Sequence, residues 1–85
     1  MKEIGKVIHY YTNIGVAVVE LSHTLRVGDK IRIQGATTDF TQEVDSIEIE
    51  HQKTEEAHKG DAIGLEVEDR VREGDTVYKL EEEED

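Results

Sequence analysis

The chain has 85 residues, enough for one small domain with a single core and too few for a second domain. It contains no cysteine, which excludes disulfides and thiolate chemistry, and its apolar residues are mainly Val, Ile and Leu, so we expect an aliphatic core. No apolar run is long enough for a signal peptide or a membrane span, and we therefore expect a soluble, cytoplasmic protein.

The formal net charge is −11, and five of the negative charges lie at positions 81–85, so residues 1–80 carry −6. A domain of that sign has no overall attraction for phosphates, and binding to nucleic acid would require a local basic patch. The candidates are Lys30 and Arg32 on one strand face and Arg70 and Arg72 near a turn, unless all four are ordinary solvated charges. We expect the acidic segment 81–85 to be disordered, because like charges repel and nothing apolar anchors it.

Alternation of apolar and polar residues predicts a β protein without a convincing helix. Six strands are expected, at residues 3–11, 14–21, 27–34, 39–50, 60–67 and 75–80. In the first strand we expect Ile4, Ile8 and Tyr10 on one face. The second strand is the most apolar in the chain, which favours a central position in the sheet. In the third strand Ile31 and Ile33 are expected to point inward.

The fourth strand changes its alternation phase part of the way along. Phe40, Gln42 and Val44 have one parity, and Ile47 and Ile49 have the other. A strand whose side chains alternate strictly cannot keep both sets on the same face. We therefore predict a β-bulge or a sharp bend near positions 45 and 46, of the kind that a small barrel uses to turn a corner.

A Gly-Asp pair opens three of the expected strands. The pairs are Gly28-Asp29, Gly60-Asp61 and Gly74-Asp75. Glycine supplies a positive φ angle, and an aspartate side chain caps a turn by accepting a backbone hydrogen bond. The spacings between the pairs are unequal, so we interpret them as a recurring turn and not as a tandem repeat. The connector from Glu68 to Gly74 carries Val71 as its expected apolar anchor.

These motifs resemble the second domain of elongation factor Tu and other translational GTPases. An I-E-x strand, a polar connector ending E-A-x-x-G-D and an x-[IV]-G-L strand match Ile47, Glu48, Glu56, Ala57, Gly60, Asp61, Ile63, Gly64 and Leu65. The segment LRVGDKIRI at 25–33 resembles the family's V-G-D-x-[IV] hairpin, and residues 4–7 resemble its G-[KR]-V opening. The resemblance spans positions 4–80 and implies an all-β, six-stranded Greek-key β-barrel, with residues 1–80 as one domain.

The resemblance also implies a site. In the elongation factors the glutamate of the I-E-x strand packs against the terminal adenosine of aminoacyl-tRNA, and the matching position is Glu48. Glu50 and His51 stand where the family has an aromatic residue and an arginine. We therefore take Glu48, Glu50 and His51, with the four cations named above, as candidates for contact with RNA or a protein partner.

Other chemistry has little support in the sequence. The phosphate-binding loop G-x-x-x-x-G-K-[ST] is absent, which argues against nucleotide hydrolysis. His51, Glu55, Glu56 and His58 lie close together in the sequence, but an acidic connector with two histidines is typical of a solvated loop as well as of a metal site. Glu48 and Glu50 share a predicted strand face without any sign of a pocket. We expect neither catalysis, nor a metal, nor another cofactor.

We therefore expect a non-enzymatic, translation-factor-like binding module that acts in translation or in an RNA-linked complex. The alternative is an accessory, protein-binding subunit of a collagenase-like peptidase or of an RNA-modifying enzyme. Collagenase-like peptidases have a similar barrel appended to them, and this chain resembles that appended domain. The expected partner is a protein or a ribosome–RNA complex. Edge strands of a small barrel could pair with a partner, and an acidic surface could face a basic one.

Overall fold

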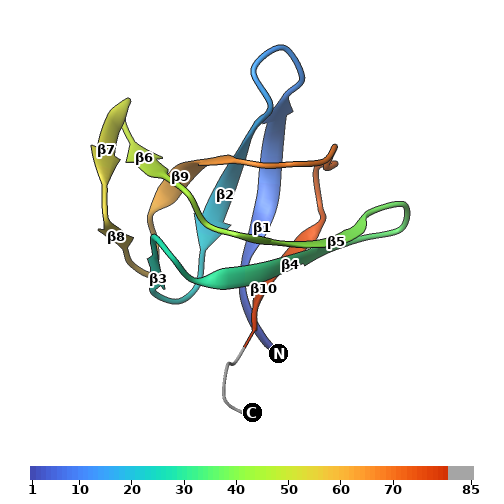
Figure 1. The fold of residues 1–85 in the computed structure, drawn as a ribbon, viewed down its shortest axis with the longest axis horizontal. Helices are drawn as coiled ribbons and strands as arrows, with labels where there is room; N and C mark the ends of the chain where they lie inside the picture. The colour runs from blue at the N-terminus through green and yellow to red at the C-terminus, as the bar shows by residue number, and fades with distance from the viewer. Residues whose placement is uncertain (81–85) are drawn as a thin grey trace.

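The computed structural model describes residues 1–80; the acidic segment that we predicted to be disordered lies outside the described residues. The described part of the chain is all-β, as expected, and has no helix (Figure 1). Its ten strands are β1 (Lys2–Tyr11), β2 (Val16–Leu21), β3 (Leu25–Arg26), β4 (Lys30–Gln34), β5 (Asp39–Glu43), β6 (Ile47–Ile49), β7 (Gln52–Thr54), β8 (Glu56–Ala57), β9 (Ala62–Glu66) and β10 (Thr76–Lys79). Consequently, these residues include no helix long and apolar enough to cross a membrane.

Eight strands form one antiparallel sheet in the order β5-β4-β10-β1-β2-β9-β6-β7, and β3 pairs with β8 in a separate two-stranded sheet. Each of the six expected segments contains strand. The count is higher because the fourth segment divides into β5 and β6, and because the short strands β3, β7 and β8 form inside the predicted connectors. The most apolar strand, β2, lies between β1 and β9 in the interior of the sheet, as its composition predicted.

The core is aliphatic. Its buried members are Ile4, Val7, Ala17, Val19, Leu21, Leu25, Ile31, Ile33, Val44, Ile47, Ala57, Ile63, Leu65, Val71 and Val77. Ile31 and Ile33 point inward from β4, and Val71 anchors the polar connector, as predicted. Burial of such branched side chains is the dominant favourable term in the folding of a small domain that has no cysteine to form disulfides.

The predicted interruption of the fourth strand lies at positions 44–46, between β5 and β6. Gln42 is buried before the break, Val44 is buried at its first position and Ile47 is buried after it, so the break restores the inward phase. It also changes the partner, because β5 pairs with β4 whereas β6 pairs with β9 and β7. The parity argument therefore located a real corner of the fold.

Two expectations for the first hairpin were wrong. Ile8 does not share the buried face of Ile4, because the β1–β2 register shifts between Val7 and His9, and Ile8 is 46% exposed. Ile14 does not begin the second strand. It lies in a four-residue turn that Gly15 closes with a φ angle of 66°, and β2 starts only at Val16.

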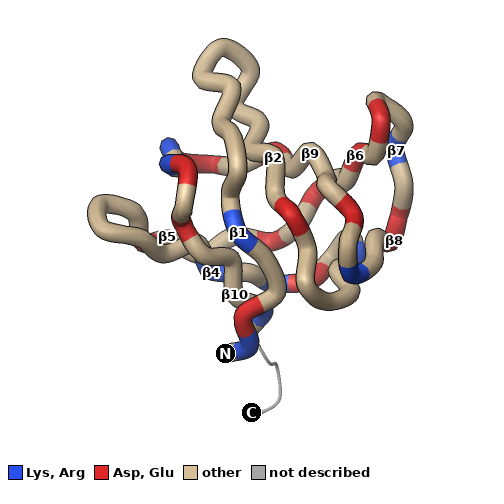
Figure 2. The backbone as a smooth tube through the Cα atoms, turned by 180° about the vertical axis from the view of Figure 1, so that it is seen from behind, with Lys and Arg blue, Asp and Glu red and all other residues tan. Residues whose placement is uncertain are grey.

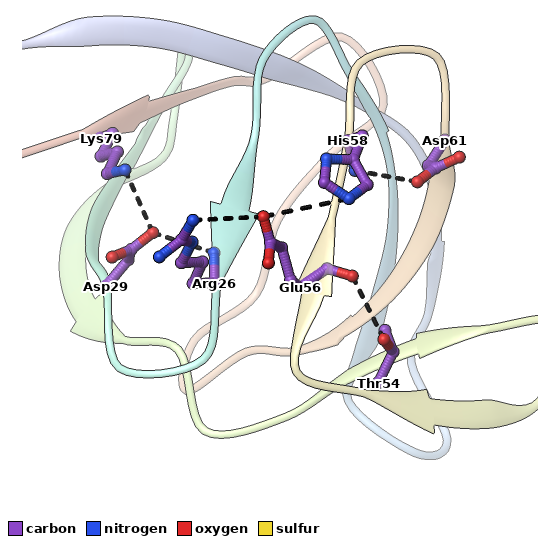
Figure 3. Close-up of polar contacts among 7 residues, drawn as sticks. All are labelled: Arg26, Asp29, Thr54, Glu56, His58, Asp61 and Lys79. Carbon is purple, nitrogen blue, oxygen red and sulfur yellow. Dashed lines mark hydrogen bonds and ion pairs between the residues drawn. The ribbon is translucent and has the colours of Figure 1, made fainter.

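The three Gly-Asp turns share one geometry, which confirms the predicted device. The glycines have φ angles of 98°, 93° and 93°, the value that the third position of a type II turn requires. In each turn an aspartate Oδ2 atom accepts the backbone N–H of the residue three positions earlier, at 2.9, 2.8 and 2.8 Å for Asp29, Asp61 and Asp75. Figure 3 shows the first two turns, with Lys79 also reaching Asp29 at 3.3 Å.

Each turn is also fastened to a buried residue of another segment. The glycine N–H donates to the carbonyl of that residue, whose own N–H donates to the carbonyl of the turn aspartate, all at 2.8–2.9 Å. The three buried residues are Val44, Leu21 and Val7. Each turn therefore satisfies backbone groups that would otherwise be unpaired beside the core, at the point where β4, β9 or β10 begins.

One buried polar side chain connects distant parts of the sheet. Gln42 on β5 is 7% exposed, and its Nε2 donates to the carbonyl of Glu66 at the end of β9 at 2.9 Å. Its Oε1 accepts the backbone N–H of Glu68 at 2.8 Å. The amide thus bonds β5, at one end of the sheet order, to the end of β9, the third strand from the other end.

Candidate functional site

The predicted site residue Glu48 lines a shallow hollow on the outer surface of β2, β9 and β6. On these neighbouring strands Val18 is opposite Gly64, and Gly64 is opposite Glu48. Because Gly64 has no side chain, the surface is depressed there; an added Cβ would lie 3.6 Å from Cγ1 of Val16. The hollow has a volume of about 320 Å³, and we call it the Gly64 trough.

The Gly64 trough has a small apolar floor and a charged rim. Val16 and Gly64 form the floor, and Asp45, Glu48, Glu66 and Lys53 lie around it. A second hollow, of about 180 Å³, adjoins the trough and shares Asp45, Ser46 and Lys53 with it. Glu48 and Lys53 are opposite each other on β6 and β7, and both are exposed. Such an open arrangement suits a surface contact better than reactions that need a desolvated carboxylate.

Glu50 does not share a strand face with Glu48, contrary to our expectation, because it lies beyond the end of β6, and His51 follows it. They form the two-residue turn between β6 and β7, with φ angles of 52° and 67°. Positive φ angles at both positions are typical of a type I′ hairpin turn, in which Asn-Gly is the preferred pair. Side chains with a Cβ atom are strained in that conformation, so this turn carries strain that a more usual sequence would relieve.

The predicted cations are engaged in part. Arg32 forms a two-pronged contact with Asp39 across β4 and β5, with Nε–Oδ1 and Nη2–Oδ2 distances of 2.7 Å. This hydrogen-bonded pair raises the pKa of Arg32 and holds the pKa of Asp39 below its ordinary value. Arg72 donates through Nε to the hydroxyl of Thr37 at 2.8 Å, in the β4–β5 connection.

The other two cations, Lys30 and Arg70, are exposed. Lys30 lies at the start of β4 opposite Glu43. Arg32 and Arg72 both donate hydrogen bonds to residues of the β4–β5 hairpin, Asp39 and Thr37. Figure 2 shows blue and red positions scattered over the backbone, so the basic residues are interspersed with carboxylates.

The connector considered for metal binding is divided by the fold. His51 lies in the β6–β7 turn, whereas Glu56 lies on β8 and His58 follows it. Oε2 of Glu56 is 3.3 Å from Nη2 of Arg26 and 3.9 Å from Nε2 of His58, as Figure 3 shows. Glu56 thus makes a surface ion pair across the β3–β8 sheet, and such exposed pairs contribute little to stability.

The sequence reasoning missed an exposed apolar surface at the tip of the β1–β2 hairpin. Tyr11 is 49% exposed and Ile14 is 65% exposed, and both line an open hollow of about 310 Å³ that also includes Tyr10. A signal was present in the sequence. Positions 7–19 contain no Asp, Glu, Lys or Arg, in a chain where such residues make up 36%.

The comparisons with known proteins find similarity to part of a protease and to part of a collagenase. The chain is 46% identical over 81 residues to an uncharacterized protease of Methanocaldococcus jannaschii and 39% identical over 84 residues to a collagenase of Porphyromonas gingivalis. These matches cover 94% and 96% of this chain but 20% and 23% of the relatives, so the chain spans about a fifth of their length. No family model matches the chain.

The solved structures agree in fold. The C-terminal domain of a candidate U32 peptidase of Geobacillus thermoleovorans superposes with a TM-score of 0.89 at 23% identity, covering 93% of this chain and 100% of that domain. A second structure of the same domain gives a TM-score of 0.88 over 94% of this chain. The chain therefore has the small all-β fold of that peptidase C-terminal domain.

Proposed function

We propose that this chain is a non-enzymatic, cytoplasmic accessory domain that binds to a collagenase-like peptidase of the U32 type. The observation that carries the proposal is similarity over nearly the whole chain to about a fifth of a protease and of a collagenase. A segment that matches so small a share of larger peptidases is more readily a supporting unit than the unit that cleaves peptide bonds.

The described surface supports a binding role. The Gly64 trough and its neighbour are open, and their carboxylates lie at the rim. Within residues 1–80 the exposed apolar side chains at the β1–β2 hairpin add a surface of the kind used for protein contact. The domain would act by positioning the peptidase or its substrate, and the chemistry would reside in the partner.

We infer further that the sheet of this accessory domain closes into a Greek-key barrel resembling the second domain of elongation factor Tu. The two hydrogen bonds of Gln42 support closure, because they join β5 to the end of β9 where no backbone pairing connects these strands. A closed barrel would hold the outer hollows on a rigid frame.

The expectation of a role in translation has less support. Arg32 and Arg72 make local hydrogen bonds with Asp39 and Thr37, and residues 1–80 carry a net charge of −6, so an electrostatic contact with RNA would be weak. Glu48 keeps this second candidate open, because the position that the elongation-factor resemblance assigns to the RNA end lies in the trough.

The test is affinity purification of the tagged chain from its native cells after mild cross-linking. Recovery of a peptidase related to the two curated relatives, in near-equal amount to the tagged chain, is the expected result. Absence of any such peptidase, combined with salt-sensitive co-sedimentation of the chain with ribosomes, would reject the proposal in favour of a role in translation.

A further inference from the structure

The β1–β2 hairpin projects beyond the rest of the sheet as an uncharged finger. Figure 1 shows the loop extending past the neighbouring strands, and Figure 2 shows it free of charged positions. We define the finger as residues 8–16. Its exposed apolar side chains are those of Ile8, Tyr11 and Ile14.

Folding does not require an isoleucine at the tip. The turn is built by backbone groups, since the N–H groups of Ile14 and Gly15 both donate to the carbonyl of Tyr11, at 3.3 and 2.9 Å. Gly15 supplies the positive φ angle, and its carbonyl accepts the N–H of Val67 at 3.0 Å. The side chain of Ile14 is 65% exposed and does not belong to the core, although polar residues are the usual choice in such a loop.

Tyr11 has a fixed neighbour. Its ring contacts that of His9 edge-on, with 4.4 Å between centroids, and Nδ1 of His9 lies 3.3 Å from Oε2 of Glu73 in the connector before β10. A tyrosine whose ring already packs against a neighbouring ring has less conformational entropy to lose on binding, and tyrosine is enriched among the residues that dominate interface energies.

We propose that this finger is the anchor by which the domain docks on the larger, catalytic part of a U32-type peptidase, with Ile14 and Tyr11 entering an apolar depression there. This inference rests on the function proposed above. The curated relatives are about five times as long as the matched segment, so a segment of this type accompanies a much larger body of protein. Three side chains cannot supply the roughly 800 Å² per partner of a standard interface, so the finger anchors a wider contact.

A second copy of this chain is a poorer occupant. Two copies would each bring a formal net charge of −11, and their mutual repulsion opposes association through a small apolar tip. A larger partner can present a basic or neutral surface around the depression and thereby complement the acidic remainder of the domain.

The test compares matched charge insertions at the tips of two hairpins. Ile14→Asp places a carboxylate on the finger, and aspartate suits a hairpin loop, so the variant should fold. Ala36→Asp places the same charge at the exposed β4–β5 turn and is the control. Tyr11→Ser removes the second anchor without a charge, and Ile14→Leu preserves the apolar tip. Thermal unfolding establishes that each variant is folded.

In the native-cell purification, Ile14→Asp and Tyr11→Ser should each reduce the recovered peptidase by about tenfold, the effect of losing one interface anchor. Ala36→Asp and Ile14→Leu should leave the recovery unchanged. Equal peptidase recovery with all four variants would overturn the finger as anchor while leaving the accessory function intact. Equal losses with Ile14→Asp and Ala36→Asp would also overturn it, because the effect would then come from charge alone.

Two further outcomes would decide against the inference. If the wild-type chain recovers no peptidase, the proposed function fails and the docking surface fails with it. If sedimentation analysis of the purified chain shows a concentration-dependent dimer that Ile14→Asp abolishes, the finger binds a second copy and the peptidase is not its occupant.

Discussion

Replacement of Gln42 by leucine tests whether its side-chain amide, which joins β5 to the end of β9, stabilises the sheet. The substitution keeps a side chain of similar size at a position that is 7% exposed. It removes the N–H donor to the carbonyl of Glu66 and the oxygen that accepts the backbone N–H of Glu68. The backbone groups at these two positions then have no partner in the folded state unless water reaches them.

The expected magnitude follows from these two bonds. An unsatisfied buried backbone group costs about 1–3 kcal/mol. Glu66 and Glu68 are exposed residues, so water can reach part of their backbone, and we expect about 2 kcal/mol in total after the gain from the apolar leucine. For a domain of this size, that lowers the unfolding midpoint by about 8–16 °C.

The assay is thermal unfolding followed by circular dichroism, with a urea titration to obtain the free energy of unfolding. Gln52→Leu is the control, because Gln52 is exposed on the short edge strand β7 and should leave the midpoint within about 2 °C. A midpoint for Gln42→Leu as close to wild type as that of the control would refute the reasoning, since the bridge would then contribute nothing.

Three other perturbations have defined outcomes. His51→Gly should raise the free energy of unfolding, measured in urea, by about 0.5–1 kcal/mol. Glycine adopts a positive φ angle without strain, and this gain exceeds the cost of the extra conformational entropy that glycine adds to the unfolded chain. A lower free energy of unfolding would show that His51 is not strained. Gly74→Ala should cost about 1–2 kcal/mol because its φ angle is 93°, whereas Gly64→Ala, with contacts no closer than 3.6 Å, should cost less in the same assay. Because Arg32 depresses the pKa of Asp39 below 3.8, the stability from this pair is present above that pH and is lost as the pH falls through the lower folded-state pKa. The difference in unfolding midpoint between wild type and Asp39→Asn should therefore shrink on acidification, and a difference that grows would show the sign to be wrong.

Local patterns predicted the features that depend on neighbouring residues. Parity alone located the corner between Val44 and Ile47, because side chains alternate strictly along a strand. The same logic failed for Ile8, where a shift in the β1–β2 register, set by pairing across two strands, displaced it from the core face. It failed for Ile14 because the length of the turn depends on the conformation of Gly15.

The sequence could predict a residue of the candidate site, but it could not predict the hollow in which that residue lies. Glu48 was chosen from a motif, and it does line a hollow. The hollow itself exists because the β6–β9 register places Gly64 opposite Glu48, a pairing between residues 16 positions apart that no local pattern reveals. Conversely, the uncharged run that forms the finger was visible in the sequence, but all of it except positions 12 and 13 was interpreted as strand.

The features that stabilise the domain and the surfaces proposed to bind a partner use different residues. The Gly-Asp turns and Gln42 satisfy backbone groups next to the core, whereas the side chains of Tyr11 and Ile14 lie largely outside it. Changes at the tip should therefore reduce binding while leaving the unfolding midpoint nearly unchanged, and changes at the turns should do the reverse. A variant that loses its partner but keeps its unfolding midpoint therefore identifies an interface residue. A mutation in the small core could not do so, because lost binding could then result from unfolding.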